Sequence, residues 1–148
     1  MTAGLFAHTL AARLGLADGV AGTALAAPRE VLDAARAGAP GSNIEYKPLA
    51  GVYQLRPSLF LWCFCSMDAE LKRVLPALRR NLEEAGALWI SWPKKSSWAT
   101  LRIDPATAVT EEAIRAYARP LGLVDVTACA IDETWSALKL VIRAEPRD

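Results

Sequence analysis

The sequence predicts an α/β fold, in which one three-layer domain holds a mostly parallel sheet with an antiparallel hairpin at its C-terminal end. Residues 59–65 and 87–92 are uncharged apolar runs of strand length, typical of strands that helices bury on both faces. Apolar residues recur at helical spacing between these runs. The last two apolar segments, 123–131 and 135–143, are separated by only three residues. That connection is too short for a parallel crossover and predicts a hairpin.

Composition narrows the class of protein. The 148 residues are 53% hydrophobic and 22% charged, which is enough for one buried core and argues against disorder. Lys and Arg number 17 against 16 Asp and Glu, so the chain lacks the basic excess expected of a nucleic-acid-binding protein. No apolar run reaches the roughly 18 residues of a membrane span, and the N-terminus lacks a secretory pattern. Three cysteines give no disulfide framework, so a cytoplasmic setting is expected.

The first third of the chain predicts small elements separated by turns. The expected elements are a helix at 5–14, a strand at 20–27, a helix at 29–37 and a short strand with a turn at 44–54. Pro28 fits the first position of the second helix, Glu30 favours its first turn, and Gly38 ends it. We expect one domain over 1–148, with 1–17 as an N-terminal helical extension.

A long helix should follow the strand at 59–65. Ser66 or Asp68 can cap it, and Gly86 should end it. Its inner stripe consists of Leu71, Val74, Leu75, Leu78 and Leu82. Pro76 should kink this helix or divide it into two pieces.

The C-terminal third predicts one more helix before the hairpin. Thr110 can cap that helix, and Glu111 and Glu112 have the charge that the helix dipole favours in a first turn. Pro120 and Gly122 should end it. Strands 59–65, 87–92 and 123–131 should therefore run parallel, with 135–143 antiparallel to them.

Five segments of the chain resemble the bacterial domain-of-unknown-function 3052 family. They are Leu14-Gly15-Leu16, Ala27-Pro28-Arg29-Glu30, residues 86–95 with Trp-Pro-Lys-Lys, residues 122–125, and residues 131–136 with Asp-Glu-Thr-Trp-Ser. The resemblance implies a small bacterial protein with a Rossmann-like fold, similar to a truncated class I methyltransferase. In those enzymes too the last two strands form an antiparallel hairpin. The family name carries no established activity.

A methyltransferase reading can be tested against the residues. Binding of S-adenosylmethionine on such a fold uses a glycine-rich turn after the first strand and an acid after the second. Residues 25–29 contain no glycine, and Gly19 and Gly22 lie before or inside the strand. Glu45 lies near the second strand, but a single acid is weak support. We therefore expect no cofactor.

Metal and nucleophile chemistry also finds few candidate residues. His8 is the only histidine, and an ordinary helix-face histidine is its simplest interpretation. Cys63 and Cys65 share one face of a strand, and only Cys129 remains to join them. Zinc sites generally need four ligands, so buried structural thiols are favoured over a metal site.

One group of residues does predict a site. Polar and aromatic side chains follow the carboxyl ends of two strands, namely Trp92, Lys94 and Lys95 on one loop and Asp132, Glu133 and Trp135 on the other. Both loops should leave the edge at which open α/β sheets bind ligands. Salt bridges and turn caps that brace the two loops are the alternative interpretation.

The sequence favours a non-catalytic role. We expect a ligand-binding or protein-interaction module on a methyltransferase-like scaffold without the cofactor loop, with an unidentified small molecule or protein as partner. Neither nucleic acid nor a membrane is expected. The alternative is an enzyme, for example a divergent methyltransferase, that acts on a small anionic metabolite. Lys94 and Lys95 would then stabilise charge while Asp132 or Glu133 acts as base. A homo-oligomer that uses the sheet or the Trp-bearing loops is a further alternative.

Overall fold

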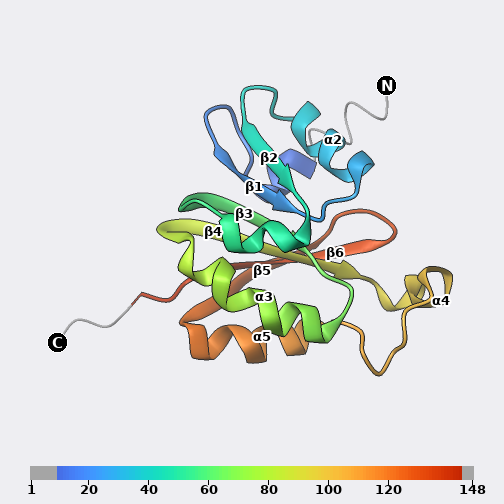
Figure 1. Ribbon diagram of the computed structural model, residues 1–148. Helices are drawn as coiled ribbons and strands as arrows, with labels where there is room; N and C mark the ends of the chain where they lie inside the picture. Colours follow the sequence, from blue (N-terminus) through green and yellow to red (C-terminus); the bar gives the residue numbers. More distant parts are fainter. Residues whose placement is uncertain (1–9, 145–148) are drawn as a thin grey trace.

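The computed structural model describes residues 10–144, which form a six-stranded sheet of order β2-β1-β3-β4-β6-β5 (Figure 1). The strands are β1 (Ala21–Leu25), β2 (Asn43–Lys47), β3 (Ser58–Phe64), β4 (Leu82–Pro93), β5 (Leu123–Ala130) and β6 (Trp135–Ile142). Strands β1 to β4 pair in parallel, and β6 runs antiparallel to both β4 and β5. The mostly parallel sheet and its final hairpin are therefore confirmed.

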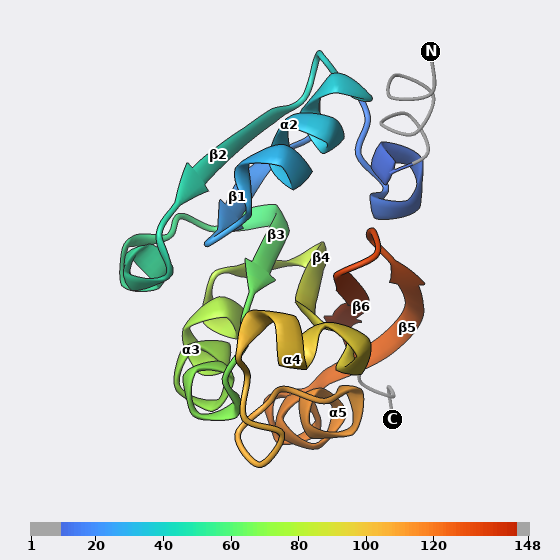
Figure 2. The ribbon, with the colours of Figure 1, turned by 90° about the vertical axis from the view of Figure 1, so that its right-hand side faces the viewer.

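Helices cover both faces of this sheet. They are α2 (Arg29–Ala37), α3 (Asp68–Arg80), α4 (Trp98–Leu101) and α5 (Glu111–Ala118), with 3₁₀ turns η1 (Leu49–Gln54), η2 (Lys95–Ser97) and η3 (Arg119–Leu121). Figures 1 and 2 show α2 on one face, while α3 and α5 lie on the other. This arrangement confirms the three layers.

Strand β3 shows why both faces are buried. Its alternation sends Phe60, Trp62 and Phe64 into the core beneath α2, and Leu61 and Cys63 into the core beneath α3 and α5. These five residues are at most 3% exposed. Such a strand has to be uncharged, because a charged side chain on either face would be buried away from water.

Local signals place two helices as expected. Helix α2 spans 29–37 with Glu30 in its first turn, although Pro28 is the N-cap rather than the first helical residue. Helix α5 begins after Thr110, whose side chain accepts a hydrogen bond from the Ala113 amide at 3.2 Å. Gly122 ends the following turn in a left-handed conformation (φ 76°).

The predicted end of the long helix is wrong. Helix α3 stops at Arg80 instead of continuing to Gly86, and β4 begins at Leu82. Asn81 ends the helix by donating from its side chain to the Ala77 carbonyl at 2.9 Å, while its own carbonyl accepts from the Ser58 amide. A register shift between Ser58 and Phe60 then absorbs the extra residues of β4 as a bulge.

Two further expectations about α3 also need correction. Pro76 lies inside one continuous helix, so it does not divide the helix into two. Neither Ser66 nor Asp68 caps the helix, because Met67 is the N-cap residue. Asp68 instead accepts a hydrogen bond from the Tyr117 hydroxyl at 2.6 Å, which ties α3 to α5.

The predicted helix at 5–14 is described only from residue 10. Residues 10–14 are helical, and Leu10 and Leu14 are buried in the core beneath α2. The indole of Trp89 donates to the Leu14 carbonyl at 3.1 Å, which fixes this turn to the sheet. His8 lies outside the described residues. Within residues 10–144, no helix has the length and apolar character needed to cross a membrane.

Candidate functional site

The predicted edge brings its two loops together. Lys94 donates from its backbone amide to the Thr134 carbonyl at 2.8 Å and from Nζ to the Asp132 carbonyl at 2.6 Å. Both loops therefore leave the same edge of the sheet, as expected from strand direction. Figure 1 shows this edge where α4 and the β5–β6 turn lie.

The salt bridges that the bracing interpretation allowed between the two loops do not form. Among residues 10–144, no ion pair joins Lys94 or Lys95 to Asp132 or Glu133. The Asp132 carboxylate closes its own turn by accepting from the amides of Thr134 and Trp135, each at 2.8 Å. An Asp that folds back on its own backbone is a turn device. Lys94 and Asp132 therefore brace the two loops, as the alternative interpretation of this edge expected.

The two indoles do not converge. Trp92 pairs with Ser136 in the ladder and lies in the core beneath α3, whereas Trp135 pairs with Pro93 and lies beneath α2. Successive strand residues point to opposite faces, so adjacent ladder pairs separate these rings. Trp135 packs edge-on against Phe64 with ring centroids 5.1 Å apart.

Three of the six predicted site residues border the same hollow. Trp92, Lys94 and Lys95 border a cavity of about 410 Å³ between η2 and the first turn of α5. Glu111 and Arg115 line its other wall. Arg115 forms ion pairs with Glu111 and Asp125.

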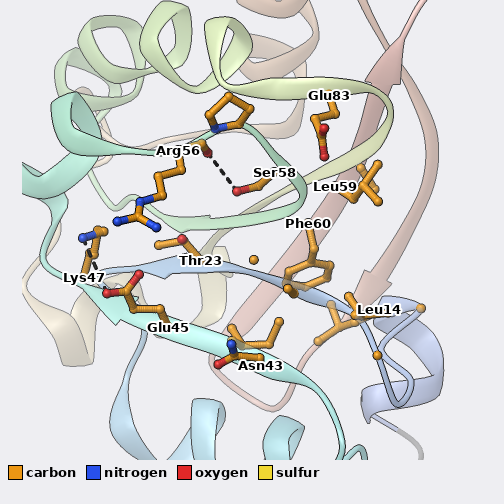
Figure 3. Close-up of a pocket in the computed structure, with 18 of the residues that line it drawn as sticks. Leu14, Thr23, Asn43, Glu45, Lys47, Arg56, Ser58, Leu59, Phe60 and Glu83 are labelled. Carbon is orange, nitrogen blue, oxygen red and sulfur yellow. Dashed lines mark hydrogen bonds and ion pairs between the residues drawn. The ribbon is translucent and has the colours of Figure 1, made fainter.

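A larger groove lies at the amino ends of the parallel strands (Figure 3). Its volume is about 1100 Å³, and residues from β1, β2, β3 and β4 line it. The β2-to-β3 connection explains why it is open. That connection is the 3₁₀ turn η1 followed by an extended segment, instead of an α-helix that would cover the sheet.

Polar and apolar side chains occupy different parts of this groove. Figure 3 shows Lys47, Glu45, Arg56 and Thr23 together over β1 and β2. The Lys47 ammonium lies 3.7 Å from the Glu45 carboxylate. Leu14, Leu59 and Phe60 lie together at another part of the groove.

The sequence did not predict this groove, although one signal for it is present. In β2, Asn43, Glu45 and Lys47 alternate with Ile44 and Tyr46. Period-two alternation of this kind indicates a strand with one uncovered face. No local sequence pattern identifies Thr23 and Arg56 as groove residues, because only the folded chain brings them to this face of the sheet.

The carboxyl ends of β1 and β3 are the place where a nucleotide cofactor would bind on such a sheet. The strand order reverses between β1 and β3, which makes this the topological switch point. Ala26 turns the chain there in a left-handed conformation (φ 58°), and its amide donates to the Lys47 carbonyl at 2.8 Å. The chain therefore turns sharply here although residues 25–29 contain no glycine. The turn is made at the cost of backbone strain in an alanine.

The cysteines have the properties of structural thiols. Cys63 and Cys65 are at most 2% exposed, with their Sγ atoms 3.6 Å apart. The hydrogen bond to Cys65, together with burial, raises the pKa of Cys63 well above its ordinary value. Cys129 is half-buried and packs against the other core, and its partial burial raises its pKa. Among residues 10–144 no cluster of three potential metal-ligating side chains is found.

Comparison with known proteins bears on the fold. Neither the models of known protein families nor the curated proteins match this sequence. Solved structures do match. The mitomycin 7-O-methyltransferase MmcR superposes with a TM-score of 0.68 at 14% identity, over 97% of this chain and 54% of the enzyme. The chain thus spans about half the length of that methyltransferase.

Two matching structures are nearer to this chain in length. A precorrin-6y C5,15-methyltransferase from Geobacter metallireducens superposes with a TM-score of 0.58 at 11% identity, over 90% of this chain and 86% of that protein. An S-adenosylmethionine-dependent methyltransferase from Clostridium acetobutylicum gives 0.57 at 10% identity, over 95% and 91%. At such identities the likeness concerns the fold. The chain has the Rossmann-like fold of S-adenosylmethionine-dependent methyltransferases.

Proposed function

We propose that the chain is a non-catalytic, small-molecule-binding module of bacterial origin, on a methyltransferase-like scaffold, and that its ligand lies in the groove at the amino ends of β1 to β4. The groove carries this proposal. Its volume of about 1100 Å³ is that of a ligand site rather than of a packing defect. The resemblance to the domain-of-unknown-function 3052 family in residues 86–95 and 131–136 supports the bacterial origin.

The packing at the carboxyl ends of β1 and β3, opposite the groove, also supports a role other than methyl transfer. Phe64, the last residue of β3, is 3% exposed and packs against Trp135. Neither of the two hollows described above is lined by Ala26, Ala27 or Cys65, which follow the carboxyl ends of β1 and β3.

A divergent methyltransferase is the second candidate, and one observation favours it. The left-handed turn at Ala26 directly after β1 gives the chain the sharp change of direction for which glycine was expected to be necessary. In this alternative, S-adenosylmethionine would bind beside Ala26 and Ala27.

A thermal-shift screen of small metabolites, with S-adenosylmethionine among them, distinguishes these functions, because a ligand of the native state raises the melting temperature. Asn43, exposed on β2, lines the groove. Replacing it by tryptophan should fill the groove and abolish the shifts of true ligands. Thr127, exposed on the edge strand β5, gives a matched control, since Thr127→Trp should leave those shifts intact. Hits that survive Asn43→Trp would contradict the proposed groove.

A further inference from the structure

The hydroxyl of Thr23 has no hydrogen-bond partner among residues 10–144, and it keeps contact with solvent in the groove. Thr23 is 6% exposed, lies in the middle of β1 and lines the groove. A ligand that displaces solvent from this hydroxyl has to return a hydrogen bond to it, because a hydroxyl buried without a partner costs free energy. A molecule in the groove would provide that hydrogen bond.

Two cations lie on the same part of the groove as this hydroxyl. Figure 3 shows the guanidinium of Arg56 and the ammonium of Lys47 turned toward each other near Thr23. Glu45 neutralises one of them, at 3.7 Å from Lys47. In the described part of the chain, the Arg56 side chain has no hydrogen bond or ion pair. This part of the groove therefore has a net positive charge.

One part of the remaining groove, around Leu59, suits an apolar group, although Glu83 also lines the groove (Figure 3). Leu59 is 52% exposed although it follows the first residue of a central strand, and Phe60 and Leu14 lie beside it in Figure 3. An exposed leucine next to buried apolar side chains leaves an apolar surface that a ligand would cover.

We infer that the groove binds an organic oxyanion, a carboxylate or a phosphate, whose charged group lies between Arg56 and Lys47 and accepts a hydrogen bond from the Thr23 hydroxyl. The apolar part of the same ligand packs on Leu59. This inference rests on the proposed function and adds the ligand's chemical class. A forked guanidinium suits either oxyanion, because its N–H groups match two oxygens at once.

Calorimetric titration with three probes tests the charge requirement. Phenyl phosphate and phenylacetate carry the two oxyanions, and 2-phenylethanol is their neutral counterpart. We expect at least one oxyanion to bind, about tenfold or more tightly than the alcohol. The difference between phenyl phosphate and phenylacetate identifies the oxyanion. Arg56→Gln should weaken binding of that probe about tenfold, and Thr23→Val about threefold. Arg80, exposed and outside the groove, gives a control, because Arg80→Gln removes the same charge and should leave binding unchanged.

Two outcomes overturn the inference. If all three probes bind equally and Arg56→Gln changes nothing, the groove does not select oxyanions, and the proposed binding function stands. If neither oxyanion binds at millimolar concentration, the inference also fails. The Asn43→Trp screen then decides separately whether the groove binds anything. Amide chemical shifts of Thr23, Lys47 and Arg56 show whether any bound probe occupies this groove.

Discussion

Replacing Thr23 by valine should stabilise the ligand-free protein although the position lies in a central strand. Thr23 as a whole is 6% exposed. Valine keeps the branched shape, so no cavity forms, and it removes a hydroxyl that no described residue hydrogen-bonds. A fully buried hydroxyl without a partner costs about 1–3 kcal/mol in proteins, whereas the Thr23 hydroxyl keeps contact with solvent in the groove. Since Thr23 borders an open groove, we expect the lower limit, a gain of about 1 kcal/mol.

Urea unfolding followed by circular dichroism measures this gain. A domain of this size should also melt about 3 °C higher for each kcal/mol. Thr127→Val, on the exposed edge strand β5, is the matched control and should change stability by less than about 0.5 kcal/mol. Destabilisation of Thr23→Val by about 1 kcal/mol or more would refute the reasoning, because the hydroxyl would then have a partner in the folded protein.

Three other substitutions test contacts that hold the fold together. Gly22→Ala should destabilise by about 3 kcal/mol in urea unfolding, because a Cβ there would lie 1.9 Å from a carbonyl oxygen of β3; a loss under about 0.5 kcal/mol would show that the strands move apart freely. Ser91→Ala should cost about 1–3 kcal/mol, since the buried Trp62 indole, which donates to Ser91 Oγ at 2.8 Å, would lose its acceptor; an unchanged unfolding midpoint would contradict this. The hydrogen bond to Asp68 raises the pKa of Tyr117 in the folded protein. The contribution of this hydrogen bond to the free energy of unfolding is therefore fully present below the pKa of about 10 that tyrosine has in the unfolded chain, and it is lost as pH rises through the pKa of Tyr117 in the folded protein. Tyr117→Phe should remove that loss from unfolding curves measured at increasing alkaline pH, and an unaltered profile would exclude Tyr117 as its source.

The position of a strand could be predicted where burial on both faces requires an uninterrupted apolar sequence. The run at residues 59–65 had to be a strand buried on both faces, and β3 spans Ser58–Phe64. The end of α3 could not be predicted in this way, because Leu82 continues the helical stripe while Asn81 ends the helix through hydrogen bonds. A helical spacing of apolar residues indicates which residues are buried, and Leu82 is buried although it belongs to strand β4.

The site was harder to predict than the fold. Strand direction correctly placed Lys94 near Asp132, but which atom of Asp132 the lysine meets depends on a turn only three residues long. The groove was missed for a different reason. Thr23 and Arg56 lie 33 positions apart in the sequence and line the same groove, because η1 leaves one sheet face uncovered. The spacing of residues along the sequence does not show which face of a sheet lacks a covering helix.

The most direct test of the central claim is a pair of amide chemical-shift titrations, one with phenyl phosphate and one with S-adenosylmethionine. We predict that phenyl phosphate perturbs Thr23, Lys47 and Arg56, and that S-adenosylmethionine leaves the turn at Ala26 and Ala27 unchanged. Perturbation of Ala26 and Ala27 by S-adenosylmethionine at micromolar concentration would contradict the proposed function and make the chain a cofactor-binding methyltransferase homologue.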